Sequence, residues 1–211
     1  AVYTDGMGPE AAGYVCPEPR QEFYARMDAA NIDLKAFTER FYKKLTGSAL
    51  EPVLDTIRYL RFETDVWIEL TTLLIPGEND GDEEITRLVE WVRDEIGVEV
   101  PLHFTAFHPD FRMLDYPPTP PETLHRARRI ALDHGIRYAY TGNTHDKDGQ
   151  STYCHGCGTR LIGRDWYQLS DWKLDNEGHC LQCGTRCAGL FAGQPGHWGR
   201  RRQPAWIAAT R

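Results

Sequence analysis

Apolar and polar residues alternate along residues 18–142 with two periods, one typical of strands and one typical of helices. A period of two, rich in β-branched and aromatic residues, predicts strands over residues 31–37, 66–75, 100–107 and 136–142. Apolar residues spaced three and four apart predict helices over residues 18–29, 39–46, 51–62, 82–96 and 119–134. Strands that alternate with helices form parallel sheets through right-handed crossovers. The pattern therefore predicts an α/β fold whose four strands make an open sheet or half of an eight-stranded barrel.

Residues with strong positional preferences set the limits of two of these helices. Thr38 is the predicted N-cap of the second helix, and Gly47 stops that helix. Residues Thr119 to Glu122 form a capping-box pattern with proline in the first turn, and Gly135 ends the helix that follows.

The periodic pattern stops at a polar stretch, residues 143–151 (NTHDKDGQS), beyond which cysteine, glycine and tryptophan dominate. We interpret this stretch as a linker. It divides the chain into an α/β domain over residues 1–150, a small cysteine-rich module over residues 151–193 and a basic tail over residues 194–211. The first fifteen residues have no initiator methionine and no clear helical pattern, so we expect the chain to be part of a longer protein.

Five of the six cysteines lie between residues 154 and 187. Two copies of Cys-x-x-Cys-Gly indicate metal binding, because this spacing lets both thiolates point into one tetrahedral corner and the glycine accepts a left-handed turn. The 22 residues between the two copies fit a hairpin with strands at 160–162, 166–169 and 172–174. A segment of about 35 residues has too small a hydrophobic core to fold without a stabilising metal ion or cross-link. We therefore expect one structural zinc ion, held by Cys154, Cys157, Cys180 and Cys183; two disulfides or idle thiols are the alternative.

Three neighbours of these cysteines are not expected to bind the ion. His155 and His179 flank ligand cysteines, but four thiolates already complete a tetrahedral set and leave no open catalytic position. Cys187 follows the second motif, and we interpret it as incidental.

Composition narrows the classes of function. The chain has 211 residues, of which 41% are hydrophobic and 26% charged, as in ordinary globular proteins. Its net charge of −7 gives no basic field that attracts nucleic acid or a membrane surface. No apolar run reaches the roughly 18 residues of a membrane helix, and no signal segment opens the chain. We expect a cytoplasmic protein with neither a membrane nor a nucleic acid as its partner.

Polar residues stand near the carboxyl ends of the predicted strands, where parallel α/β domains bind ligands. These residues are Asp33, Lys35, Glu69, Thr71, His103, His108 and Asn143. Asp33 and Lys35 alternate onto the same face of their strand, and an acid beside a base can hold a zwitterionic ligand. On spacing alone, a pair at an exposed strand edge, satisfied by water, is the favoured explanation.

Several long motifs occur in collinear order. They are NIDLKAF (31–37), WIELTTLLIPGEND (67–80), PLHFTAFHP (101–109), YTGN (140–143) and, between the cysteine pairs, LIGRDWY (161–167). On these motifs residues 31–211 resemble the C-terminal part of the radical S-adenosylmethionine (SAM) enzyme of the AmmeMemoRadiSam system. That enzyme is related to the glycyl-radical activating enzymes, such as the pyruvate formate-lyase activating enzyme.

The resemblance implies a partial TIM-type barrel that binds SAM at its strand ends, with contacts from Asp33, Lys35, Thr71 and His108. The family's DLK motif matches Asp33 and Lys35 and contacts the methionyl part of the cofactor; relatives often have arginine near Thr71. The family's CxxxCxxC loop, which holds a [4Fe–4S] cluster, has no counterpart here. Cys16 is the only cysteine before residue 154, and one thiolate cannot hold a cluster.

We therefore expect the iron–sulfur cluster, reductive SAM cleavage and hydrogen abstraction only in a complete protein, and no catalytic residue in this chain. The resemblance implies that the partner is a protein substrate or another component of the AmmeMemoRadiSam system.

Two other classes of function stay open. One is a protein- or nucleic-acid-binding zinc ribbon on an inert α/β scaffold, slightly supported by the arginine triplet at 200–202. The other is a metal hydrolase with Asp33, Glu69, His103 and His108 as ligands. His103 and His108 are five apart on a predicted strand and should face opposite ways, which argues against a shared ion.

Overall fold

The computed structural model describes residues 10–191. The chain forms two compact units, Ala1–Gly149 and Gln150–Arg211. The predicted basic tail, residues 194–211, lies outside the described residues. No helix in the described part is both long enough and apolar enough to cross a membrane.

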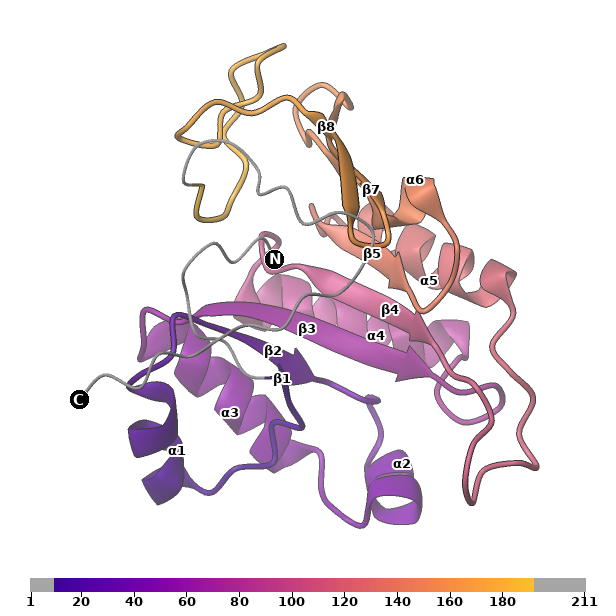
Figure 1. The fold of residues 1–211 in the computed structure, drawn as a ribbon. Coiled ribbons are helices and arrows are strands. Elements are labelled where there is room, and N and C mark those ends of the chain that lie inside the picture. The colour runs from indigo at the N-terminus through magenta and orange to yellow at the C-terminus, as the bar shows by residue number, and fades with distance from the viewer. Residues whose placement is uncertain (1–9, 192–211) are drawn as a thin grey trace. The chain divides into compact units, whose positions relative to one another are not determined.

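The first unit contains a parallel sheet whose strands follow one another in space as they do in sequence (Figure 1). All four neighbouring pairs in the order β1-β2-β3-β4-β5 are parallel. The strands are β1 (Glu10–Ala11), β2 (Ala29–Asp33), β3 (Trp67–Leu74), β4 (Leu102–Ala106) and β5 (Ala139–Gly142). The predicted α/β class is confirmed. Because each crossover advances by one position in the sheet, the order is that of part of a barrel.

Helices cover one face of this sheet, and Figure 1 shows α3, α4 and α5 on that side. The helical elements are α1 (Pro17–Tyr24), α2 (Glu39–Phe41) with the π-helix η1 (Tyr42–Thr46), α3 (Glu51–Phe62), α4 (Asp82–Trp91) with the π-helix η2 (Val92–Ile96), α5 (Pro121–Asp133) and α6 (Lys147–Gln150). The core lies between the helices and the sheet. Alternate strand residues, such as Ile32, Leu70, Leu102 and Phe104, are completely buried there.

The intervening strand residues point to the other face, and most of them are polar. The polar residues on this face are Asn31, Asp33, Glu69, Thr71, His103, Thr105 and Tyr140. The register aligns Asp33 with Thr71, Thr71 with His103, and His103 with Tyr140. A polar row therefore crosses four neighbouring strands, and its ends are about 14 Å apart at a strand spacing of about 4.8 Å.

Several predicted helix limits are confirmed. The third predicted helix, α3, covers residues 51–62, and its apolar stripe is buried. Thr38 caps α2 by accepting a hydrogen bond from the Phe41 backbone N–H at 3.4 Å. Gly47 ends η1 with φ of 67°, a left-handed conformation in which glycine is not strained.

Other expectations for the first unit are wrong. The first helix ends at Tyr24 rather than at residue 29, because Ala29 and Ala30 begin β2 and are buried in the sheet. Strand β1 was not predicted, since two residues carry no periodic signal. Part of the expected linker, residues 147–150, is the short helix α6.

The prediction of a capping box at Thr119 is also wrong. Helix α5 begins after Pro120, and no side chain caps it. The Thr119 hydroxyl instead donates to the Leu74 carbonyl at 2.6 Å and accepts from the Phe107 N–H at 2.9 Å. This residue therefore joins the ends of β3 and β4 rather than the first turn of the helix.

The second unit contains a three-stranded antiparallel sheet in the order β6-β7-β8. Its strands are β6 (Thr152–Tyr153), β7 (Arg160–Asp165) and β8 (Gln168–Trp172). The expected hairpin exists, but the return strand begins two residues later than predicted, because Trp166 has φ of 55° and turns the chain. The third strand is β6 rather than residues 172–174; Leu174 instead forms an isolated bridge with Cys180.

Candidate cofactor and metal sites

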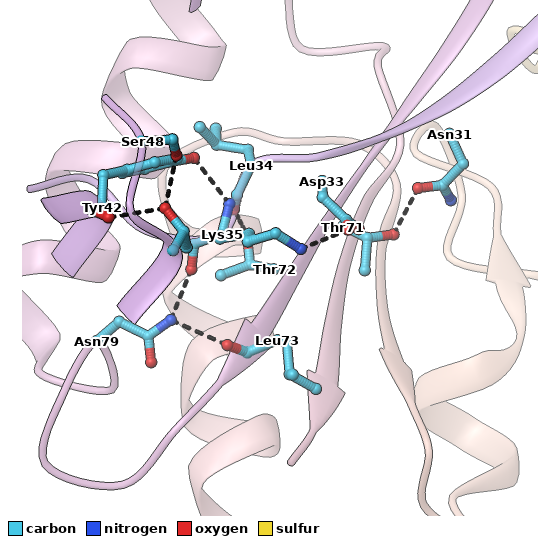
Figure 2. A network of polar contacts seen from close by, with 11 residues as sticks. Asn31, Asp33, Leu34, Lys35, Tyr42, Ser48, Thr71, Thr72, Leu73 and Asn79 are labelled. Carbon is cyan, nitrogen blue, oxygen red and sulfur yellow. Dashed lines mark hydrogen bonds and ion pairs between the residues drawn. The ribbon is translucent and has the colours of Figure 1, made fainter. Parts of the chain in front are cut away.

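Residues 34–37 follow the last residue of β2 and are held by side chains rather than by a neighbouring strand. Thr72 donates its hydroxyl to the Leu34 carbonyl at 2.7 Å, and Tyr42 accepts the Lys35 N–H on its phenol oxygen at 3.1 Å. Asn79 donates to the Lys35 carbonyl at 2.6 Å. Figure 2 shows these contacts at Leu34 and Lys35. The backbone of this segment is therefore fixed from several elements at once.

The side chains of Asp33 and Lys35 form an ion pair at the carboxyl end of β2, with Nζ 2.6 Å from Oδ2. The two side chains are 24% and 33% exposed, so both are partly open to solvent. The predicted strand over residues 31–37 ends at Asp33, so Lys35 lies just beyond it rather than on its face, but the two side chains meet in this contact. An acid and a base in this position can exchange their mutual bond for bonds to an ammonium group and a carboxylate of one ligand.

The other predicted cofactor residues, Thr71 and His108, come from β3 and from the loop after β4, and they are not both gathered at this pair. Thr71 is the register neighbour of Asp33, and its hydroxyl donates to the Asn31 side chain at 2.8 Å. His108 is exposed on the loop after β4, where its Nδ1 is 3.0 Å from the Pro109 carbonyl oxygen. Among the described residues, no hydrogen bond or ion pair joins His108 to Asp33 or Lys35.

A buried carboxylate–imidazole pair lies on the polar face of the sheet. Glu69 is 5% exposed, and its Oε2 lies 2.8 Å from His103 Nε2. Burial is the largest single influence and raises the pKa of Glu69, but the hydrogen bonds from His103 and Trp67 act together with nearby positive charge, so the pKa is lowered overall. An ionised carboxylate only accepts hydrogen bonds, so Nε2 of His103 carries the hydrogen. The His103 ring also stacks on Tyr140, with centroids 5.0 Å apart.

Sequence reasoning missed the roles of Asn79 and Tyr42. Asn79 is 2% exposed and uses both ends of its amide: Oδ1 accepts from the Ile75 N–H at 2.7 Å, and Nδ2 donates to the carbonyls of Lys35 and Leu73. The available signal was an asparagine three residues after the Pro76 turn, a position at which amides often bond the local backbone. Its bond to Lys35 spans 44 residues and has no local signature.

In the second unit, two knuckles with the same backbone geometry bring four cysteines together. The N–H groups of Cys154 and Cys180 bond the carbonyls of Thr159 and Thr185, each at 2.9 Å. Gly158 and Gly184 have φ of 72° and 75°, as the motif predicted. The sulfur atoms of Cys154, Cys157, Cys180 and Cys183 all lie within 4.8 Å of one another.

The sulfur separations fit a tetrahedral metal site. Sγ of Cys154 is 3.6 Å from that of Cys183, and Sγ of Cys157 is 3.8 Å from that of Cys180. A tetrahedron with metal–sulfur bonds of about 2.3 Å has edges of about 3.8 Å. All six cysteines are free thiols, so the alternative of two disulfides is not what the structure contains. The four-cysteine group can bind a metal ion.

Threonine hydroxyls lie beside the two exposed thiols of this group. Thr159 Oγ1 is 3.3 Å from Cys157 Sγ, and Thr185 Oγ1 is 3.2 Å from Cys183 Sγ. Hydrogen bonds from the Thr185 hydroxyl and backbone lower the pKa of Cys183 to about 6. Burial raises the pKa of Cys154 to about 11, a cost that a bound cation offsets by favouring the thiolate.

The neighbouring residues do not join this group. His179 Nδ1 lies 3.1 Å from Asp175 Oδ2, and Cys187 contacts the Ala188 carbonyl. Within residues 10–191, the four cysteines are the one set of three or more His, Cys, Asp or Glu side chains close enough to share an ion. Asp33, Glu69, His103 and His108 therefore do not form the common metal site that a hydrolase needs.

The parallel sheet, with helices on one face and polar residues on the other, matches the fold of radical SAM domains. A domain of the pyruvate-formate lyase-activating enzyme from Bacteroides vulgatus ATCC 8482 superimposes with a TM-score of 0.55 and 19% identity, over 64% of this chain and 80% of that chain. A radical SAM methyltransferase from Sphaerobacter thermophilus gives a TM-score of 0.52 and 15% identity, over 62% of this chain and 38% of that chain.

Sequence comparison adds two relatives. The uncharacterized protein MJ0808 of Methanocaldococcus jannaschii is 41% identical over 175 residues, 82% of this chain and 51% of that protein. The pyruvate formate-lyase 1-activating enzyme of Escherichia coli K12 is more distant, 27% identical over 124 residues, 54% of this chain and 50% of that protein. The chain thus spans about half the length of the curated relatives it matches. No family model matches it.

Proposed function

We propose that the first unit is the SAM-binding C-terminal part of a radical SAM barrel, from the enzyme of the AmmeMemoRadiSam system. The observation that carries this proposal is the Asp33–Lys35 pair, 2.6 Å apart and partly exposed at the carboxyl end of a parallel strand. The methionyl part of SAM carries an ammonium group and a carboxylate, so it complements this pair. The likeness to an activating enzyme in both fold and sequence supports the choice of cofactor.

In this proposal Asp33 accepts hydrogen bonds from the ammonium group of the ligand, and Lys35 donates to its carboxylate. Thr71, the register neighbour of Asp33, lies beside them with a hydroxyl that can add a contact. His108, on the loop after β4, is the proposed fourth contact.

A complete radical SAM enzyme also needs a [4Fe–4S] cluster, which supplies reductive cleavage of SAM and leads to hydrogen abstraction from the substrate. The residues of this chain do not fit that cluster: the one cysteine before residue 154 is Cys16, and the four-cysteine group has the geometry of a single tetrahedral ion. The cluster ligands therefore have to come from outside this sequence. A protein substrate, or another component of the same system, is the proposed partner.

For the second unit we propose a structural zinc ion bound by Cys154, Cys157, Cys180 and Cys183. Four thiolates at tetrahedral spacing leave no position for a substrate or water, which supports a structural rather than a catalytic role. The ion then stabilises a unit whose sheet has only three short strands.

Equilibrium dialysis of the full chain against radiolabelled SAM tests the cofactor proposal. Lys35→Met and Asp33→Asn should each weaken binding by roughly 10- to 100-fold, because each removes a charge-assisted hydrogen bond of about 1.5–3 kcal/mol. Lys173→Met and Asp65→Asn are matched controls, since both residues are exposed and distant in sequence from the pair. Binding that is absent in the unchanged chain, or equal in all five proteins, would contradict the proposal.

A further inference from the structure

Four side chains hold the backbone of residues 34–37, and none of them belongs to the segment itself. Besides the bonds from Thr72, Tyr42 and Asn79, Glu84 Oε1 accepts the Phe37 N–H at 2.8 Å. They come from β3, η1, the loop after β3 and α4. A strand end that has lost its ladder partners is ordinarily solvated and mobile. Here the Leu34 carbonyl, both backbone groups of Lys35 and the Phe37 N–H are instead bonded within the protein.

These bonds act on the residue whose ammonium group reaches Asp33. Lys35 is bonded at both of its backbone groups, at N by Tyr42 and at the carbonyl oxygen by Asn79 (Figure 2). A lysine side chain has four rotatable bonds, so a fixed backbone narrows the region that its ammonium group can reach. The acceptor on Tyr42 and the donor on Asn79 therefore restrict where the Lys35 ammonium group can lie relative to Asp33.

The phenol of Tyr42 suits this position. It is 1% exposed, and it lies in η1, a π-helical turn of the kind often found at functional sites. Burial raises the pKa of Tyr42 to about 12, so the group stays a neutral phenol at physiological pH. Thr46 bonds the Tyr42 carbonyl at 2.7 Å, and the Ser48 N–H bonds the same carbonyl at 3.2 Å, which fixes the turn from its other end.

From this geometry we propose that Tyr42 and Asn79 are positioning residues for the methionyl site: they hold the Lys35 backbone so that Lys35 and Asp33 present opposite charges to one ligand. The inference rests on the proposed SAM-binding function. Neither side chain needs to touch the ligand, because each acts through the Lys35 backbone.

Tyr42→Phe removes only the phenol oxygen, which bonds the Lys35 N–H and also the backbone of neighbouring Ala36. The matched control is Tyr24→Phe: Tyr24 is also 1% exposed, and its hydroxyl has no hydrogen-bond partner among the described residues. We expect Tyr42→Phe to weaken SAM binding to the full chain by about 5-fold, the value of one hydrogen bond. Tyr24→Phe should leave the dissociation constant unchanged.

A second ligand separates positioning from general loosening of the fold. 5′-Methylthioadenosine lacks the ammonium and carboxylate groups, so its affinity should be the same in the unchanged chain and in Tyr42→Phe. Equal loss of both ligands, or no loss of SAM, would overturn the inference.

Amide hydrogen exchange tests the same inference without a ligand. Tyr42→Phe should speed exchange of the Lys35 amide by about 10-fold or more relative to Leu70 in the same sheet, whereas Tyr24→Phe should not. Unchanged Lys35 exchange would show that Tyr42 does not hold this residue. If the unchanged chain binds no SAM, the proposed function fails, and the exchange result still decides whether Tyr42 holds the Lys35 backbone.

Discussion

The hydroxyl of Thr185 occupies the space that a side chain at Gly156 would need: a Cβ atom built on Gly156 would lie 2.3 Å from Thr185 Oγ1. Gly156 belongs to the first cysteine knuckle and Thr185 to the second. The same hydroxyl lies 3.2 Å from Cys183 Sγ. One close contact therefore links the backbone of one knuckle to a thiol of the other.

This contact predicts that Gly156→Ala weakens metal binding. The added methyl group must displace Thr185, a short β-branched side chain with few alternative positions, and so shift Cys183. We expect zinc affinity to fall by about 10-fold, equivalent to about 1.4 kcal/mol, as measured by competition with a chromophoric chelator. Gly81→Ala is the control, because a Cβ there meets no atom within 4 Å. Equal affinities of the two variants would contradict the contact.

The threonine hydroxyls should also tune the thiolates that bind the metal. Thr185→Val keeps the shape of the side chain and removes the hydrogen bond to Cys183. A thiolate without that bond is a stronger electron donor, so the sulfur-to-metal charge-transfer band of the cobalt-substituted protein should move to lower energy. Thr185→Ser, which retains a hydroxyl, should leave the band in place; an unshifted band in Thr185→Val would count against the hydrogen bond.

The cysteines differ in their expected effect on metal content. Cys154→Ser and Cys180→Ser should each lower bound zinc from about one ion per chain toward none. The second unit should then unfold, because it loses the metal ion that stabilises it. Cys16→Ser and Cys187→Ser should retain the ion. Elemental analysis of the purified proteins, with circular dichroism to follow the fold, provides the measurement. Retention of zinc by Cys154→Ser, or its loss from Cys187→Ser, would show that the ligand set is wrong.

Stability should depend on acid pH through Glu69. Its pKa is lowered in the folded protein, so the stabilisation is present above the unfolded value of about 4.3 and is lost as pH falls through the folded value. Urea unfolding should show a free energy of unfolding that decreases below about pH 4.3. Glu69→Gln cannot ionise, so its free energy of unfolding should depend less on pH. Glu63→Gln, at an exposed position, should keep the pH dependence of the unchanged chain. Parallel profiles for Glu69→Gln and the unchanged chain would contradict the role of the Glu69–His103 pair.

The sequence predicted those features of the fold that depend on local pattern. Helix α3 was placed correctly because its apolar spacing is regular, and the two knuckles because the Cys-x-x-Cys-Gly spacing is a strong local signature of their turn. Thr119 shows the limit of this reasoning. Its hydroxyl had a local use as a cap, but bonds to Leu74 and Phe107 from distant parts of the chain took its place.

The candidate cofactor site was predictable in the same partial way. The alternation of Asp33 and Lys35 indicated that their side chains lie together, and they form an ion pair although the strand ends at Asp33. The side chains that fix Lys35 were not predictable, because Tyr42 comes from a π-helical turn and Asn79 is 44 residues away in sequence. Such contacts depend on the register of β2 with β3, which the pattern of one strand does not define.

The central claim is that Asp33 and Lys35 bind the methionyl part of SAM, and a crystal structure of the full chain with SAM tests it most directly. The account predicts the ligand's ammonium group within hydrogen-bond distance of the Asp33 carboxylate and its carboxylate on Lys35 Nζ, with the Lys35 backbone still bonded to Tyr42 and Asn79. SAM bound elsewhere, with the 2.6 Å bond between Asp33 and Lys35 intact, would contradict it.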